Sequence, residues 1–271
     1  MPKGIFSDGW TLKITIVVPP EREYFAVDDL KRHNIKMPAN VTRAKEQHLL
    51  LRNTLRDEGV KVVEIAELKG HPNSVFAMDT SLSLGDSFII LRMGLESRRG
   101  EETWMAKILS DMGLEEIGRV VAPGTAEGGD LIPAYPYFFI GRSSRTNDEG
   151  VRQISKIVEN YGYETIKIKV PEPHLHLGGA MSLVDGHIIL ACNNLEIPQI
   201  GEFNILRVRC KTFISGNVIN LGKERVILEK RNYEVRKILE QWGFRTIPLD
   251  LSEFVKGSGG PSCLVLPVLR V

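Results

Sequence analysis

A cysteine and a pair of histidines are the residues of this sequence best suited to covalent and proton-transfer chemistry. Cys263 follows the turn Gly257-Ser-Gly-Gly-Pro-Ser, and a cysteine just after a glycine-rich turn can be exposed and activated as a nucleophile. His174 and His176 stand two residues apart, so the alternation of a strand would place both imidazoles on one face. A lone cysteine is more often a core residue, and a His-x-His pair without an obvious third ligand is about as often structural as functional. Combined with carboxylates, the cysteine and a histidine become candidates for a nucleophile and its acid–base partner.

Two segments supply such carboxylates. Asp79 ends the segment Asn73-Ser-Val-Phe-Ala-Met-Asp79, which we expect to be an apolar strand, where a charge is costly unless it is paired or hydrogen-bonded. Glu127-Gly-Gly-Asp130 places an acid on either side of two glycines, so that backbone can pass close to a ligand while both acids point inward. A turn carboxylate at Asp79 and a plain turn at residues 127–130 are the competing interpretations.

Two arginines follow similar turns. Arg145 lies in Gly141-Arg-Ser-Ser-Arg-Thr-Asn147 after an expected strand at 137–140, and Arg98 lies in the basic turn Ser97-Arg-Arg-Gly100. Arginine suits bidentate recognition of a carboxylate or a phosphate. In isolation, Arg145 is typical of a surface arginine near a helix N-terminus, and Arg98 is typical of solvated charge.

The composition excludes several classes of function. The 271 residues are 42% hydrophobic, and 35 Lys and Arg balance 34 Asp and Glu, whereas a dedicated nucleic-acid binder would carry a basic excess. No apolar run approaches the roughly 20 residues that span a bilayer, and residues 1–10 lack the apolar region of a secretory signal. We therefore expect a cytoplasmic protein without nucleic-acid or membrane partners. Phosphate-loop, dinucleotide-binding and zinc-protease motifs are absent from the sequence, and three cysteines are too few and too unevenly spaced for a disulfide framework or a zinc knuckle.

The elements that position these residues repeat along the chain. Four segments share one layout, an amphipathic helix followed by a glycine and a short apolar strand; the glycines are Gly59, Gly113, Gly162 and Gly243. Glycine fits the left-handed position that ends a helix, which explains its recurrence. The longest interval, between Gly162 and Gly243, leaves room for a degenerate fifth unit, which we expect around residues 197–221.

Pairs of strands fill the intervals between the helices. The apolar runs 81–91, 131–140 and 182–191 are each interrupted by two turn residues, which indicates β-hairpins. The chain is therefore predicted to repeat a strand–strand–helix–strand unit four or five times within one domain, residues 1–271. A doubly wound α/β sheet is the alternative, but its parallel crossovers do not supply a hairpin in every unit.

Taken in chain order, these segments resemble the guanidine-modifying enzymes of the pentein superfamily. The nearest match is the dimethylargininase (dimethylarginine dimethylaminohydrolase) family, with arginine deiminases and amidinotransferases as relatives. The matching segments span nearly the whole chain and are Thr42–His48, Ser74-Val-Phe with Asp79, Ser97-Arg-Arg, Glu127-Gly-Gly-Asp130, Gly141-x-Ser-x-Arg-Thr-Asn147, Leu175-His-Leu and Cys263. The resemblance implies an α/β fold, a five-bladed propeller of ββαβ units around a pseudo-fivefold axis, on which residues distant in sequence share one pocket.

The resemblance also implies a reaction and roles for the residues. The enzyme would be a hydrolase that acts on the guanidino carbon of an arginine-type amino acid, converting N-methylated arginine to citrulline and an amine without a metal or other cofactor. Cys263 would attack this carbon to form a covalent thiouronium, and His176, oriented and charged by Glu127, would protonate the departing amine and then activate water. The implied substrate-binding residues are Asn73, Asp79, Arg98, Asp130, Arg145 and Gly257. Among them, Asp79 would hold the guanidinium, both arginines would hold the α-carboxylate, and Gly257 would offer backbone contacts.

Two positions depart from the family pattern. Asn73 and Met78 stand where dimethylargininases usually carry acids, which removes negative charge from the guanidinium pocket, although Met78 offers an apolar contact to an N-methyl group. The alternatives are an amidinotransferase or an arginine deiminase of the same fold and, from another class, a non-catalytic pentein scaffold used for binding. The presence of Cys263 and His176 favours an enzyme. The implied partner is a small-molecule guanidino amino acid, and a homodimer is the candidate assembly.

Overall fold

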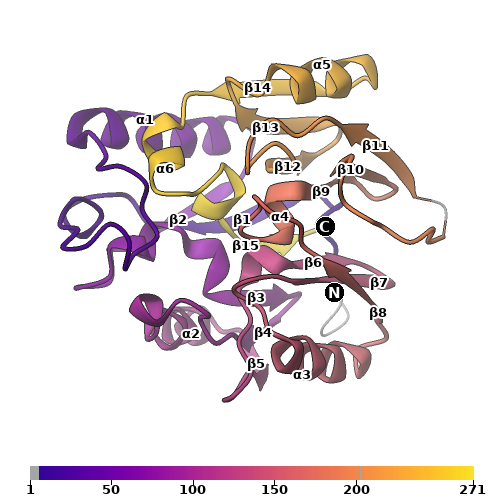
Figure 1. The fold of residues 1–271 in the computed structure, drawn as a ribbon, viewed down its shortest axis with the longest axis horizontal. Coiled ribbons are helices and arrows are strands. Elements are labelled where there is room, and N and C mark those ends of the chain that lie inside the picture. Colours follow the sequence, from indigo (N-terminus) through magenta and orange to yellow (C-terminus); the bar gives the residue numbers. More distant parts are fainter. Residues whose placement is uncertain (1–5, 202) are drawn as a thin grey trace.

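Five small sheets surround a central axis in the computed structural model, which describes residues 6–201 and 203–271 (Figure 1). Each sheet has three strands, in which the middle strand pairs antiparallel with one neighbour and parallel with the other. This arrangement is the five-bladed α/β propeller expected from the sequence. The N-terminal residues 1–5, which belong to the segment examined for a secretory signal, lie outside the described residues.

The blades follow one another along the chain. Their strands are β15 (Leu266–Arg270), β1 (Leu12–Val17) and β2 (Lys61–Glu64); β3 (Ser81–Leu84), β4 (Ser87–Ile90) and β5 (Glu115–Arg119); β6 (Leu131–Ala134), β7 (Tyr137–Arg142) and β8 (Glu164–Lys169); β9 (Met181–Asp185), β10 (Ile188–Cys192) and β11 (Asn204–Val208); and β12 (Val218–Gly222), β13 (Arg225–Glu229) and β14 (Arg245–Leu249). The three predicted hairpins are confirmed as β3–β4, β6–β7 and β9–β10.

Helices cross over between the middle and the last strand of four blades. They are α1 (Val41–Asp57), α2 (Glu101–Asp111), α3 (Asp148–Glu159) and α5 (Tyr233–Gln241); two short helices, α4 (Leu177–Ala180) and α6 (Ser252–Lys256), lie elsewhere. Each of the four crossover helices is followed by its predicted glycine with a positive φ, between +84° and +91°. A residue with a Cβ would be strained there, so glycine defines where each helix ends.

The fifth unit differs from the prediction in its position and in its crossover. It spans residues 181–208 rather than 197–221, and no helix is present in the described part of its crossover between β10 and β11. A disulfide joins Cys192 at the end of β10 to Cys210 just after β11. The cysteine count did not predict this bond, because spacing along the chain does not reveal that β10 and β11 lie side by side.

The ring closes where β15 pairs antiparallel with β1, which brings the two ends of the sequence into one blade. Buried apolar clusters occupy the boundaries between neighbouring blades; for example, Phe88 and Ile16 pack between the first two blades, and Phe139 and Leu183 pack between the third and fourth. Packing between blades therefore holds the ring together, and removal of one of these side chains would cost about 2–5 kcal/mol.

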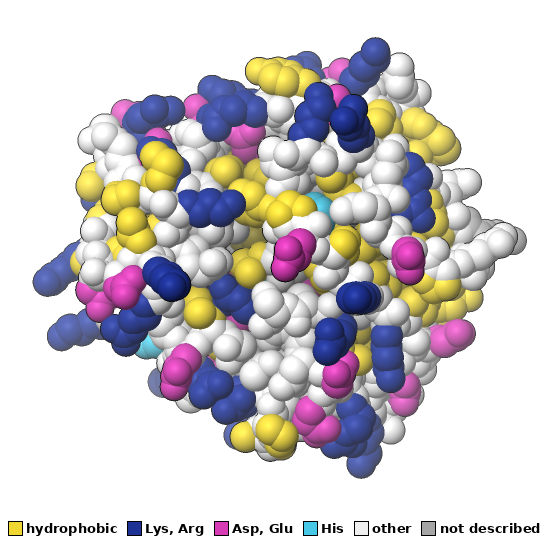
Figure 2. Space-filling view, in the orientation of Figure 1, with side chains coloured by type: hydrophobic (Ala, Val, Ile, Leu, Met, Phe, Trp, Pro, Cys, Tyr) yellow, Lys and Arg dark blue, Asp and Glu magenta, His cyan; other side chains and the backbone are white. Residues whose placement is uncertain are grey.

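Surface charges of both signs are interspersed on the face shown in Figure 2, in keeping with the net charge of +1. Within residues 6–201 and 203–271, no helix is both long enough and apolar enough to cross a bilayer.

Candidate active site

Each blade has a polar residue shortly before its first strand, and four of these five residues line one site. Neighbouring first strands contact one another around the axis, as β15 does with β3, and β9 does with β6 and β12. The residues that precede them are Asp79, Asp130, His176, Asn217 and Cys263. Residues separated by almost 200 positions in the sequence therefore converge at one end of the axis.

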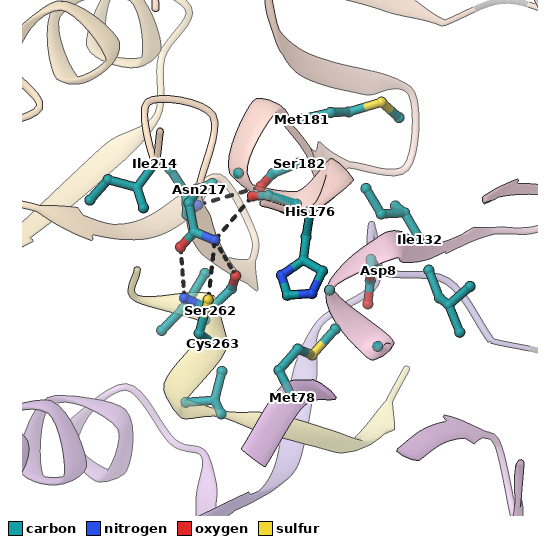
Figure 3. Close-up of a pocket in the computed structure, with 18 of the residues that line it drawn as sticks. Asp8, Met78, Ile132, His176, Met181, Ser182, Ile214, Asn217, Ser262 and Cys263 are labelled. Atoms are coloured by element: carbon teal, nitrogen blue, oxygen red, sulfur yellow. Dashed lines mark hydrogen bonds between the residues drawn. The ribbon is translucent and has the colours of Figure 1, made fainter. Parts of the chain in front are cut away.

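Two cavities meet at this end and share His176 and Cys263. The smaller cavity, of about 20 Å³, is also lined by Asp79, Arg98 and Arg145. The larger, of about 70 Å³, is mostly apolar and extends along the axis. In Figure 3, Asn217 and Cys263 lie on one side of this larger cavity, His176 lies near its centre, and Met78 lies below the histidine.

His176 is the N-cap residue of α4 and does not belong to a strand. Its imidazole lies in a charged cluster. Its Nε2 atom is 2.7 Å from Glu127 Oε2 and 3.8 Å from Asp79 Oδ1. Burial disfavours the imidazolium, but the carboxylates of Asp79, Asp130 and Glu127 outweigh it and raise the pKa of His176 to about 9. The histidine therefore carries a proton at neutral pH and can act as an acid.

Glu127 is fully buried and held in position by the backbone. Its Oε1 atom accepts hydrogen bonds from the N–H groups of Gly94 and Leu95 at 2.9 and 3.1 Å. Burial disfavours its charge, but the hydrogen bond and charge of His176, together with Arg145 and Arg98, lower the pKa of Glu127 to about 2. An ionised Glu127 can thus orient and charge the imidazole, as the resemblance implies.

Arg98 lines the smaller cavity and is also paired with two acids of the protein. Its guanidinium donates to Asp79 Oδ2 at 2.6 Å, to Glu101 Oε2 at 2.7 Å and to the carbonyl oxygen of Phe76 at 2.9 Å. These contacts hold the side chain in place, and Arg98 in turn orients Asp79, whose Oδ1 also accepts from the Gly129 N–H at 3.1 Å. The expected contact of Arg98 with a substrate carboxylate stays a prediction.

Asp130 lies behind the site, and its expected contact with the substrate stays a prediction. It is fully buried, is absent from the lining of both cavities, and accepts hydrogen bonds from Ser143, Thr146 and the Leu177 N–H at 2.6, 2.6 and 2.8 Å. These contacts tie the loop that carries Arg145 to the start of α4. Asp130 therefore supports the site from behind and does not contact the cavity.

Arg145 retains donors that can reach a ligand. It is 7% exposed and lines the smaller cavity, and its contact with Glu127 Oε1 is long, at 3.5 Å. Gly257 and Asn73 line the same cavity. A Cβ on Gly257 would lie only 2.6 Å from Tyr24 Oη. The backbone can therefore lie this close to its neighbours at the cavity only because the residue is glycine. The Nδ2 of Asn73 donates to the His33 carbonyl at 3.1 Å, and its Oδ1 is buried without a described partner.

Cys263 lies in the 3₁₀ turn Ser262–Leu264, which precedes β15. Its Sγ atom accepts from the Gly260 N–H at 3.4 Å and from Asn217 Nδ2 at 3.9 Å. Burial is the main cause, and the negative charge of Asp79 the second, that raise the pKa of this thiol to about 12. Asn217 was not among the predicted residues. Its position directly before the first strand of a blade could have indicated that it belongs to the site.

Asp79 and His174 also differ from their predicted local structure. Asp79 ends the 3₁₀ turn Ala77–Asp79 rather than lying in a strand, and His174 lies before α4 outside any strand. His174 does not line either cavity of the site, so the structure separates it from His176.

One group of metal-ligating atoms occurs in the site. Ligand atoms of Asp79, Glu127 and His176 lie within 4.8 Å of one another. The two acids are neutralised by His176 and Arg98, and a protonated imidazole would repel a metal ion. Their arrangement is therefore better suited to proton transfer than to metal binding.

Comparisons with known proteins show the family and the fold of this chain. The family described as N,N dimethylarginine dimethylhydrolase, eukaryotic, matches residues 23–270. The chain is 32% identical over 241 residues to the N(G),N(G)-dimethylarginine dimethylaminohydrolase of Pseudomonas aeruginosa, covering 89% of this chain and 94% of that protein. The solved structure of a cysteine-to-serine mutant of DDAH from Pseudomonas aeruginosa, complexed with citrulline, has a TM-score of 0.83 at 29% identity and covers 95% of this chain and 99% of that one. SxtG, an amidinotransferase from Microseira wollei, shares the fold with a TM-score of 0.81 at 20% identity, covering 100% and 98% of the two chains.

Proposed function

The chain belongs to the N,N-dimethylarginine dimethylhydrolase family, and we propose that it hydrolyses an N-methylated arginine to citrulline and a methylated amine. The observation that carries the proposal is the 2.7 Å contact of His176 with Glu127 beside cavities that both include Cys263. A nucleophile, a charged acid and an anion for the guanidinium are the three groups that this substitution requires.

Substrate binding follows from the charges that line the smaller cavity. Asp79, held by Arg98, offers its carboxylate to the guanidinium, and Arg145 offers a planar donor pair to the α-carboxylate. Asn73 Oδ1 has no described donor and can accept from an amino or guanidino nitrogen. Met78 lines the adjoining apolar cavity with His176 and Cys263, where an N-methyl group would find an apolar contact.

The first half of the reaction forms a covalent bond to Cys263. The cationic substrate binds beside the thiol, counters the negative field of Asp79 and lowers the thiol pKa, so the thiol proton leaves to solvent. The Sγ thiolate attacks the guanidino carbon, a C–S bond forms, and His176 gives its proton to the methylated nitrogen as that C–N bond breaks. The methylated amine departs and leaves a thiouronium on Cys263 and a neutral His176.

The second half releases the product. Neutral His176 takes a proton from a water molecule, whose oxygen attacks the thiouronium carbon. The tetrahedral adduct collapses, its hydroxyl proton passes to the departing sulfur, and the C–S bond breaks. Citrulline, the Cys263 thiol and protonated His176 result, so the resting charges are restored.

An assay of ureido product with dimethylated, monomethylated and unmethylated arginine and with agmatine tests the proposal. We expect citrulline from a methylated arginine, and a covalent adduct on Cys263, detected by mass spectrometry, when the unmodified protein is quenched with acid during turnover. His176→Ala should lose at least about 10²-fold in rate, whereas His174→Ala should keep turnover. A higher kcat/KM for arginine would indicate a deiminase, and product that appears only with an amine acceptor would indicate an amidinotransferase. A failure of all four guanidines to react would contradict the proposal.

A further inference from the structure

A second group of ligating side chains lies outside the proposed active site, in the blade that lacks a crossover helix. His174 precedes α4, Cys192 ends β10 and Cys210 follows β11. An imidazole nitrogen and the two sulfur atoms lie within 4.8 Å of one another, and the two cysteine Cα atoms are 5.4 Å apart. This set of one nitrogen and two sulfurs is typical of sites for zinc-type cations.

The imidazole of His174 has one nitrogen fixed by a hydrogen bond and one nitrogen available to a ligand. Its Nδ1 lies 3.0 Å from the carbonyl oxygen of Phe213, an acceptor that requires the proton on this nitrogen. The other nitrogen, Nε2, is then an unprotonated lone pair, and it is buried without a hydrogen-bond partner among the described residues. The residue is only 7% exposed, so this lone pair is not satisfied by bulk water. A histidine that binds a metal through one nitrogen commonly donates the other N–H to a backbone carbonyl.

We propose that, once the Cys192–Cys210 disulfide is reduced, these two cysteines and His174 bind a zinc-type dication. A dithiol reductant supplies two electrons and two protons: the S–S bond breaks, two thiols form, and the reductant becomes a disulfide. Metal binding then releases both thiol protons and forms two metal–sulfur bonds and one metal–nitrogen bond. The two sulfur atoms separate to about 3.8 Å, the spacing that zinc–sulfur bonds of about 2.3 Å give in a tetrahedron.

Charge and access both suit a metal at this position. Two thiolates neutralise a dication, so the complex adds no net charge to surroundings that include the fully buried Cys192. Cys210 is partly exposed, so a reductant can approach this end of the disulfide. His174 also lines an open cavity of about 490 Å³.

Titration of the protein with Co²⁺ as an optical probe, in reduced and in oxidised form, tests this site. Every protein in the series carries Cys263→Ser, so that Cys192 and Cys210 are the only thiols in the sequence. We expect one Co²⁺ per reduced chain, with sulfur-to-cobalt charge-transfer absorption, and none of this absorption in the oxidised chain. Equal absorption in both forms, or its absence from the reduced chain, would overturn the proposal without any ligand variant being needed.

Zn²⁺ competition against a chromophoric chelator then identifies the histidine. His174→Ala should weaken Zn²⁺ binding by the reduced chain at least tenfold, whereas the matched control His187→Ala, at an exposed position, should bind as the parent does. Circular dichroism before titration establishes that each variant is folded. Parent-like affinity in a folded His174→Ala chain would show that the two thiols act without the histidine and would refute the three-ligand site.

Discussion

Exchange of Glu127 for glutamine is the sharpest test of how the site charges its histidine. The substitution keeps the size of the side chain, and the amide oxygen can still accept from the Gly94 and Leu95 N–H groups, as Oε1 does now. The atom that faces His176 Nε2, however, changes from an anionic acceptor to an amide N–H₂ donor. A donor in that place favours neutral imidazole, so the pKa of His176 must fall.

The size of the change follows from the contact that is lost. A hydrogen bond to a charged group contributes about 1.5–3 kcal/mol, and about 1.4 kcal/mol moves a pKa by one. From the present value of about 9, the pKa of His176 should fall to roughly 7–8, because the carboxylates of Asp79 and Asp130 remain. The proton needed by the leaving amine is then lost over a pH range in which the native enzyme retains it.

The measurement is an NMR titration of the His176 imidazole in matched Cys263→Ser and Cys263→Ser/Glu127→Gln proteins, so that the thiol does not titrate. Turnover of Glu127→Gln with Cys263 intact should fall by up to about twofold at pH 7 and by a larger factor above pH 8, where an imidazole of pKa 7–8 has mostly lost its proton. An unchanged histidine pKa in the double variant would refute the assignment of Glu127 as the group that charges His176, even if the activity were reduced.

Four further substitutions, one of them a control, test the remaining residues. Cys263→Ser should reduce citrulline formation to background. The control Cys192→Ser should keep citrulline formation when assayed well below its unfolding temperature. Full activity in Cys263→Ser would contradict a covalent path. Arg145→Ala should raise KM at least tenfold for carboxylate-bearing guanidines, because a charged contact of about 1.5–3 kcal/mol is lost; equal KM values in steady-state assays would remove Arg145 from the binding residues. Asp130→Asn should lower the free energy of unfolding by about 1–3 kcal/mol in denaturant titrations, since an amide cannot accept from two hydroxyls and a backbone N–H as this carboxylate does; wild-type stability would show that these bonds do not matter.

The repeating elements could be predicted because local chemistry defines them. A glycine with positive φ ends each of the four crossover helices, and turn residues interrupt each predicted hairpin. The unit at 181–208 carried the hairpin signal but lacked the helix signal, because no glycine-capped helix marks its crossover. Closure into a ring came only from the resemblance, since the pairing of β15 with β1 leaves no mark in either strand.

The site was predicted in its residue types and less well in its contacts. Cys263, His176 and Asp79 are side by side along the cavities, but nothing in the sequence places Arg98 against Asp79 rather than against a ligand. That contact depends on the packing of two turns from one blade. For the same reason, the burial of Asp130 behind the site and the bond between Cys192 and Cys210 required three-dimensional information.

The pairing of β15 with β1 has a consequence for biosynthesis. Cys263 lies in the turn that leads into β15, so the nucleophile joins the pocket through the segment that closes the ring. During translation, the ribosome has made the other four sheets before this segment emerges, and a partly made chain holds His176 and Glu127 without a thiol beside them. Closure of the ring and addition of the nucleophile to the pocket therefore depend on the same segment. A translation product that ends before this segment lacks the Cys263 thiol.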